Sequence, residues 1–192
     1  MKKRQTFILA LAILAQALCI PAFAQQNDKI LEQIEETNAK VTTRQDDFVE
    51  TRKPAGKAEA TFDGQLLYDA SKGLTMNYSD EDEYFAIEGN TMSIKHDGKS
   101  MTFDLNKNKP MRTLSKFILS AFNGKLRELA QEANSEISVA ETENAIEVTL
   151  VAKKKAVKGY SKVVLNYDPK AFTLIDMLME EFDGSVTTYK WK

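Results

Sequence analysis

Cysteine and histidine are almost missing from this sequence, which has one of each in 192 residues. Zinc and related metal sites commonly use several His or Cys ligands, so a site of that kind is not expected. The sequence also lacks a glycine-rich phosphate loop, a G-x-S-x-G elbow and an H-E-x-x-H pair. His96 directly precedes Asp97-Gly98, where a solvated turn residue is the simplest interpretation. We therefore expect no catalytic residue, no metal and no cofactor, and no enzyme activity.

Basic residues do not gather on one stretch large enough for nucleic-acid binding, and the formal net charge is −2. The acidic run Ser79–Glu83 lacks the spaced oxygen ligands and the glycine of a calcium-binding hand, so it is interpreted as a solvated loop. The basic run Lys153–Lys155, with Lys158 nearby, has two interpretations. It is either a solvated loop or a contact for acidic partners or anionic head groups.

The first residues have the features of a secretory signal peptide. Basic residues at positions 2–4 precede an apolar run over residues 7–20, which is too short for a membrane span. Ala22-Phe23-Ala24 has the small-x-small pattern that signal peptidase recognises. We predict a signal peptide over residues 1–24 and a periplasmic protein whose single domain covers residues 25–192, without cysteine.

Most of the remaining chain has the alternating pattern of short strands separated by turn residues such as Gly89-Asn90 and Asp97-Gly98. The close turns favour an antiparallel meander. The predicted strands are 42–53, 59–68, 73–78, 84–88, 91–95, 100–105, 136–140, 146–152, 160–167, 173–181 and 185–191.

Two segments have helical spacing instead. Asn27 can cap a helix over about residues 28–40, and apolar residues recur every three or four positions between Leu114 and Leu129. Asn123-Gly124 interrupts the second segment, which predicts two short helices or one bent helix. The fold class is therefore α+β and mainly β: a strongly curved antiparallel sheet or barrel of about eleven strands, with helices covering one mouth.

The closing hairpin around Asp183-Gly184 concentrates soft apolar side chains. Met177 and Met179 share one face of their strand, whereas Phe182 has the opposite parity unless a bulge near Glu180-Glu181 resets it. Such residues are either ordinary core or, because methionine side chains adapt to varied shapes, the wall of an apolar cavity.

Five short stretches, taken together in order and spacing, resemble the periplasmic outer-membrane lipoprotein carriers of the LolA-like family, in a divergent branch. They cover strands and hairpins along nearly all of the chain after the predicted signal peptide. The stretches are Asp47–Thr51 (family pattern S-F-x-Q-x), Phe62–Tyr68 (G-x-L-W-V), Ile87–Met92 (a v-S-D-G-k-t-l-W hairpin), Leu150–Lys153 (L-x-P-K) and Phe182–Thr187 (D-x-x-G-N-x-T).

The resemblance implies an incompletely closed barrel with helices that cover its cavity, and a monomer that carries acylated lipoproteins or lipid. It also implies an inner-membrane release complex and an outer-membrane acceptor as partners. The family's K-R-P stretch, whose Arg helps hold the lid shut, is replaced here by Asp69–Gly73, which has no Arg. From residue type and strand parity we predict that acyl chains contact Phe48, Leu66, Tyr68, Met76, Tyr78, Phe103, Phe117, Phe122, Met177 and Met179.

Two alternatives keep the same fold. One is an envelope protein-binding or stress-sensing module without lipid transport. The other is a structural or inhibitory protein in which the apolar faces are only core.

Overall fold

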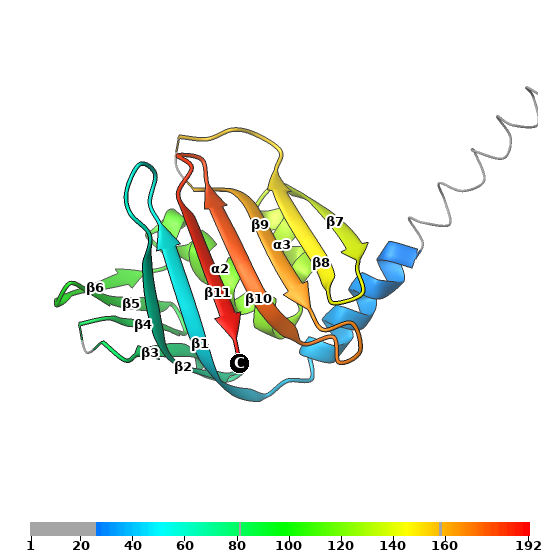
Figure 1. Cartoon of the computed structure of the whole chain (residues 1–192), viewed down its shortest axis with the longest axis horizontal. Coiled ribbons are helices and arrows are strands. Elements are labelled where there is room, and N and C mark those ends of the chain that lie inside the picture. Colours follow the sequence, from blue (N-terminus) through cyan, green and yellow to red (C-terminus); the bar gives the residue numbers. More distant parts are fainter. Residues whose placement is uncertain (1–25, 81, 158) are drawn as a thin grey trace, which may run out of the picture.

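The computed structural model describes residues 26–80, 82–157 and 159–192, and the predicted signal peptide lies outside the described residues. In the described part, eleven antiparallel strands form one curved sheet (Figure 1). The strands are β1 (Thr43–Lys53), β2 (Ala60–Asp69), β3 (Gly73–Tyr78), β4 (Tyr84–Glu88), β5 (Thr91–His96), β6 (Lys99–Asp104), β7 (Ser135–Glu141), β8 (Ile146–Ala152), β9 (Tyr160–Tyr167), β10 (Leu174–Glu181) and β11 (Val186–Trp191).

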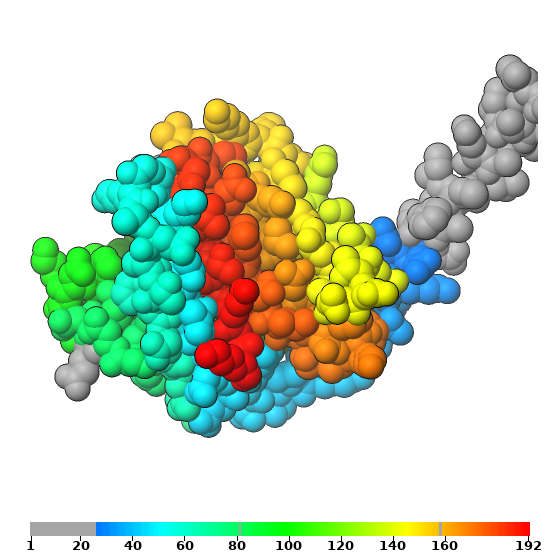
Figure 2. Space-filling view, in the orientation of Figure 1, coloured from blue at the N-terminus to red at the C-terminus, as the bar shows by residue number. Residues whose placement is uncertain are grey.

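The sheet consists of two meanders that are joined by their first and last strands. Its order is β6-β5-β4-β3-β2-β1-β11-β10-β9-β8-β7, so β1 pairs with both β2 and β11. Strands β6 and β7 are the two edges, and the barrel is therefore incompletely closed, as predicted. The outer face of the sheet is a continuous surface across β1 and β8–β11 (Figure 2).

Helix α2 (Lys109–Asn123) and helix α3 (Leu126–Glu132) lie together on the inner side of the sheet (Figure 1). Asn108 caps α2 by accepting a hydrogen bond from the backbone N–H of Met111, at 3.2 Å. The predicted break occurs at Gly124, whose left-handed φ of 74° ends α2. A Cβ at Gly124 would lie 2.6 Å from the carbonyl oxygen of Glu35, so the helix end packs directly on the N-terminal helix.

The N-terminal helix is described over residues 26–38, two residues shorter at its end than predicted. Asn38 terminates it, because its side-chain amide donates to the carbonyl oxygens of Ile34 (2.8 Å) and Phe172 (2.7 Å). Glu35 accepts from the backbone N–H of Arg127 and also pairs with its guanidinium, which fixes the helix to α3. Among the described helices, none is long and apolar enough to cross a membrane.

The core fills the space between α2 and the inner face of the sheet. Strand pairing places Leu165, Met177 and Tyr189 in one row across β9, β10 and β11, and Trp191 opposite Phe48 of β1. All five side chains are buried. The inner row of apolar side chains thus follows from the period-two alternation of each strand.

Candidate functional site

One cavity in the described part of the chain has a volume of about 600 Å³. It lies between the N-terminal half of α2 and one end of strands β7, β8, β9 and β10. Its apolar wall includes Met111, Leu114 and Phe117 from α2, Tyr160 at the start of β9, and Phe182 just after β10. The cavity is therefore a space between one helix and the sheet.

Two aromatic side chains build the inner wall of this cavity. The rings of Phe117 and Tyr160 meet edge to face, with centroids 5.6 Å apart and an interplanar angle of 74°. The pairing of β9 with β10 shifts between Glu180 and Glu181. This irregularity occurs at the position where a bulge would reset the parity of Phe182, and Phe182 beyond it lines the cavity.

The ten residues predicted to contact acyl chains separate into groups. Phe117 lies in the wall of the large cavity, and Tyr78 and Phe103 are partly buried elsewhere. The other seven are buried in the core. That these ten residues contact acyl chains remains a prediction.

Part of this set encloses a second, very narrow space further along α2. Its volume is about 170 Å³, and no part of it is wide enough for a water molecule. The indole N–H of Trp191, one of its walls, is buried and has no hydrogen-bond partner among the described residues. The space is lined by Leu66, Met76, Ile118, Phe122, Met177, Tyr189 and Trp191.

Sequence reasoning missed several residues of the large cavity, namely Met111, Leu114, Tyr160 and Phe182. Leu114 does belong to the helical apolar pattern, and the position of Phe182 depended on the bulge. Tyr160 and Met111 stand at the first positions of their elements, where periodicity carries little information. Only the position of α2 on the sheet shows that these two residues line the cavity.

A second cluster consists of charged side chains near the C-terminal end of β1, which pairs with the start of β11. Glu50 is only 2% exposed and forms a two-point ion pair with Arg52, at 2.7 and 2.9 Å. The Tyr78 hydroxyl donates to Glu50 at 2.5 Å, and Arg52 also reaches Glu83 at 3.0 Å. Burial would lower the pKa of Arg52, but Glu50 and Glu83 raise it above its ordinary value, so the guanidinium stays charged.

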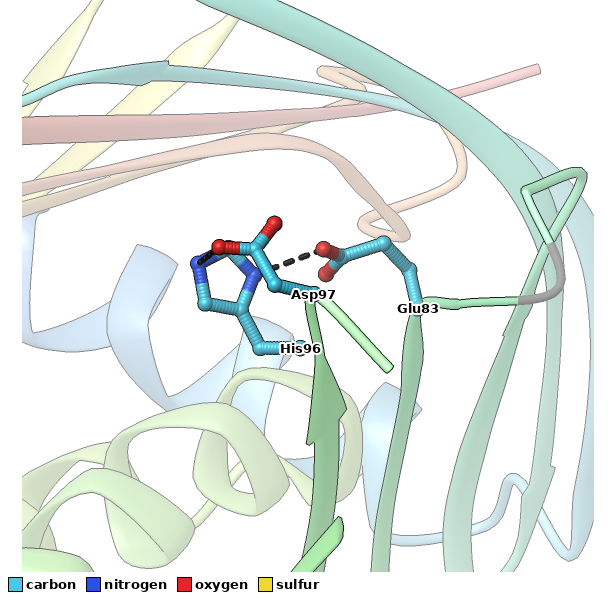
Figure 3. A group of neighbouring side chains, drawn as sticks. All are labelled: Glu83, His96 and Asp97. Carbon is cyan, nitrogen blue, oxygen red and sulfur yellow. Dashed lines mark hydrogen bonds and ion pairs between the residues drawn. The ribbon is translucent and has the colours of Figure 1, made fainter. Parts of the chain in front are cut away.

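His96 belongs to this cluster and is at the same time half exposed, in line with its interpretation as a solvated residue. Its ring lies between the carboxylates of Glu83 and Asp97, with Nδ1 2.6 Å from Glu83 Oε1 (Figure 3). Glu83 is buried, although the run 79–83 was predicted to be a solvated loop. Glu83 directly precedes β4 and His96 ends β5, and the pairing of these two strands brings the two side chains together. The guanidinium of Arg52 compensates the charge of the buried Glu83 carboxylate.

Glu83, His96 and Asp97 also bring three metal-ligating atoms within 4.8 Å of one another. The Arg52 guanidinium, however, lies 3.0 Å from Glu83 and 3.4 Å from His96 Nδ1. A cation already occupies the position between these ligands, and a second one would be repelled. The cluster is therefore an ion-pair network that joins β1, β3, β5 and the loop before β4.

No protein-family model matches the chain, and no curated protein matches it in sequence. Its structure is similar to a LolA superfamily protein from Nitrosomonas europaea, with 12% identity, a TM-score of 0.39, and coverage of 86% of this chain and 91% of that one. It is also similar to an outer membrane lipoprotein-sorting domain from Vibrio parahaemolyticus (10%, 0.41, 88% and 91%) and to the Pseudomonas aeruginosa MucA/MucB complex (8%, 0.39, 85% and 54%).

These TM-scores lie below 0.5, so the proposals below depend on the geometry of this chain alone. A LolA superfamily protein is thus among the solved structures to which the chain is similar.

Proposed function

We propose that this protein is a periplasmic carrier that holds acyl chains in the cavity beneath α2 and moves lipoproteins or lipids from the inner to the outer membrane. The observation that carries the proposal is the 600 Å³ cavity with its wall of Met111, Leu114, Phe117, Tyr160 and Phe182. Its volume falls within the range of about 300–1,000 Å³ that is usual for ligand pockets. Each buried CH₂ group would contribute about 0.8 kcal/mol to binding.

The two halves of α2 have different roles in this proposal. The C-terminal half is anchored, because Phe122 packs on Tyr68 and Trp191 and Gly124 touches the backbone of Glu35. The N-terminal half, with Met111 and Leu114, spans the cavity. Outward movement of the N-terminal half would admit a ligand while the anchored half keeps the helix in place.

The narrow space beneath Phe122 would form the deeper end of the site. It shares α2 as a wall with the large cavity, and Phe117 lies one residue before Ile118, which lines the narrow space. A small shift of α2 would therefore allow an acyl chain to reach Met177, one of the residues predicted to line the site.

The first test places a charge in the cavity wall. Leu114→Asp is expected to weaken the binding of a fluorescent fatty acid at least about tenfold, because the acyl chain would have to desolvate a carboxylate. Fluorescence titration measures this effect. Val151→Asp is the matched control, since Val151 is exposed on the outer side of β8 and should leave the dissociation constant unchanged.

Native mass spectrometry of protein purified from the periplasm provides the second test. Co-purified lipid or acylated peptide is the expected result. A clean mass together with no uptake of the fatty-acid probe would contradict the carrier proposal and favour the protein-binding module. Equal probe binding by Leu114→Asp and wild type, with both proteins folded, would contradict the assignment of this cavity.

A further inference from the structure

Charges of both signs surround the mouth of the 600 Å³ cavity without pairing with each other. Lys109 and Lys154 stand on α2 and on the loop after β8, whereas Glu181 is the last residue of β10 and Asp183 stands in the turn after it. No ion pair joins these four side chains in the described part of the chain. Asp183 accepts a hydrogen bond from the backbone N–H of Ser185, at 2.8 Å, and the other three side chains are available to a ligand whose own charges match them.

We propose that the cavity mouth binds a phosphate–ammonium head group, and that the ligand is phosphatidylethanolamine. Glu181 receives the primary ammonium, Lys109 and Lys154 receive the phosphate, and the acyl chains enter the apolar cavity. This inference rests on the proposed carrier function and specifies its ligand.

Glu181 is the carboxylate best placed to select an ammonium group. Its side chain is half-buried in the cavity wall beside Tyr160, with which it pairs across β9 and β10, and it has no hydrogen-bonded partner among the described residues. Burial, followed by the charge of Asp183, raises its pKa above the ordinary range. An ammonium group would relieve both effects, and the Tyr160 ring offers a face for the cation.

The two lysines provide the complementary site for the phosphate. Lys109 opens α2, whose first turn carries no acidic residue, so the positive end of the helix adds to its charge. Lys154 is exposed in the basic run Lys153–Lys155, for which a contact with anionic head groups was one of two interpretations. Together they place positive charge at the mouth of the cavity.

At neutral pH, the half-buried and unpaired carboxylate of Glu181 is expected to lower the stability of the fold. A carboxyl group whose pKa is raised in the folded state favours folding in its neutral form, so stability falls as the pH rises through that pKa. Glu181→Gln is therefore expected to raise the melting temperature at neutral pH and to have no such effect in acid, where Glu181 is already neutral.

The binding test uses short-chain, water-soluble phospholipids with identical acyl chains as competitors of the fatty-acid probe. Dihexanoyl phosphatidylethanolamine is expected to displace the probe from the wild-type protein at about a tenfold lower concentration than dihexanoyl phosphatidylglycerol. In Glu181→Gln the two phospholipids should become equal. The double change Lys109→Ala with Lys154→Ala should weaken both to a similar extent.

Glu143→Gln is the matched control, because Glu143 is exposed in the β7–β8 turn at the opposite end of these strands from the cavity. It should keep the preference of the wild type. Equal displacement by both phospholipids in the wild type, or an unchanged preference in Glu181→Gln, would overturn the head-group proposal. In either case uptake of the fatty-acid probe would still support the carrier, whereas no uptake would refute both proposals.

Discussion

Arg52→Met is expected to lower the free energy of unfolding by about 3–5 kcal/mol, because it leaves two buried carboxylates without their shared cation. Glu50 and Glu83 are 2% and 6% exposed, and Arg52 reaches them at 2.7 and 3.0 Å. Methionine keeps an apolar side chain over Phe62, whose ring centroid lies 4.3 Å from the Arg52 guanidinium carbon. The loss therefore measures the missing charge, and urea denaturation would give it.

Two comparisons make this result specific. Lys72→Met removes an exposed cation 3.7 Å from Asp69 and should cost less than about 1 kcal/mol. Adding Glu50→Gln to Arg52→Met should recover part of the loss, because a neutral amide is cheaper to bury than a carboxylate. A loss below about 1 kcal/mol in Arg52→Met would show that water or a rearrangement compensates Glu50 and Glu83.

The strands were predictable because their signals are local. β3, β4, β8 and β9 begin and end where alternation and turn residues placed them, and the largest differences elsewhere are one residue. The helical break was equally local, since Gly124 is the residue that adopts the left-handed conformation. The likeness of the closing hairpin to a core was also correct, because Met177 and Met179 are buried.

The ion-pair network could not be predicted from the sequence. Its members come from β1, β3, β5 and the loop before β4, and only the strand order brings them together. The period-two pattern marks Glu50 as an inward position on β1, but it does not show that Arg52 and Tyr78 satisfy the carboxylate there. The charge of Glu50 at an inward position nonetheless indicates that this side chain needs an oppositely charged or hydrogen-bonding partner.

The cavity could not be predicted from the periodicity of the sequence. Strand parity places Met177 on an inner face and helical spacing does the same for Phe117, yet neither pattern can distinguish a filled space from an open one. In the structure the C-terminal half of α2 packs tightly on the sheet, and the N-terminal half leaves about 600 Å³ open. Side-chain volumes and the tilt of α2 decide this difference.

Phe122→Ala is expected to be the most disruptive single truncation in α2. Phe122 is 1% exposed and packs on Tyr68 and Trp191, with ring centroids 5.7 and 5.2 Å away, while the Arg44 guanidinium lies 5.4 Å from its centroid. Removing the ring should cost about 3–5 kcal/mol, since the narrow space of about 170 Å³ beside it would enlarge. Phe122→Leu fills more of this volume and should cost no more than about 1.5 kcal/mol.

The same pair of variants tests whether the packing of Phe122 restrains α2. If this contact anchors the helix, Phe122→Ala should take up the fatty-acid probe faster than Phe122→Leu in stopped-flow measurements made well below the unfolding transition. The enlarged space should also bind a small apolar ligand such as benzene, which the wild type has no room for. Uptake at the wild-type rate in a folded but destabilised Phe122→Ala would show that ligand entry does not depend on this contact, and the opening movement would then have to be confined to the part of α2 before Phe117.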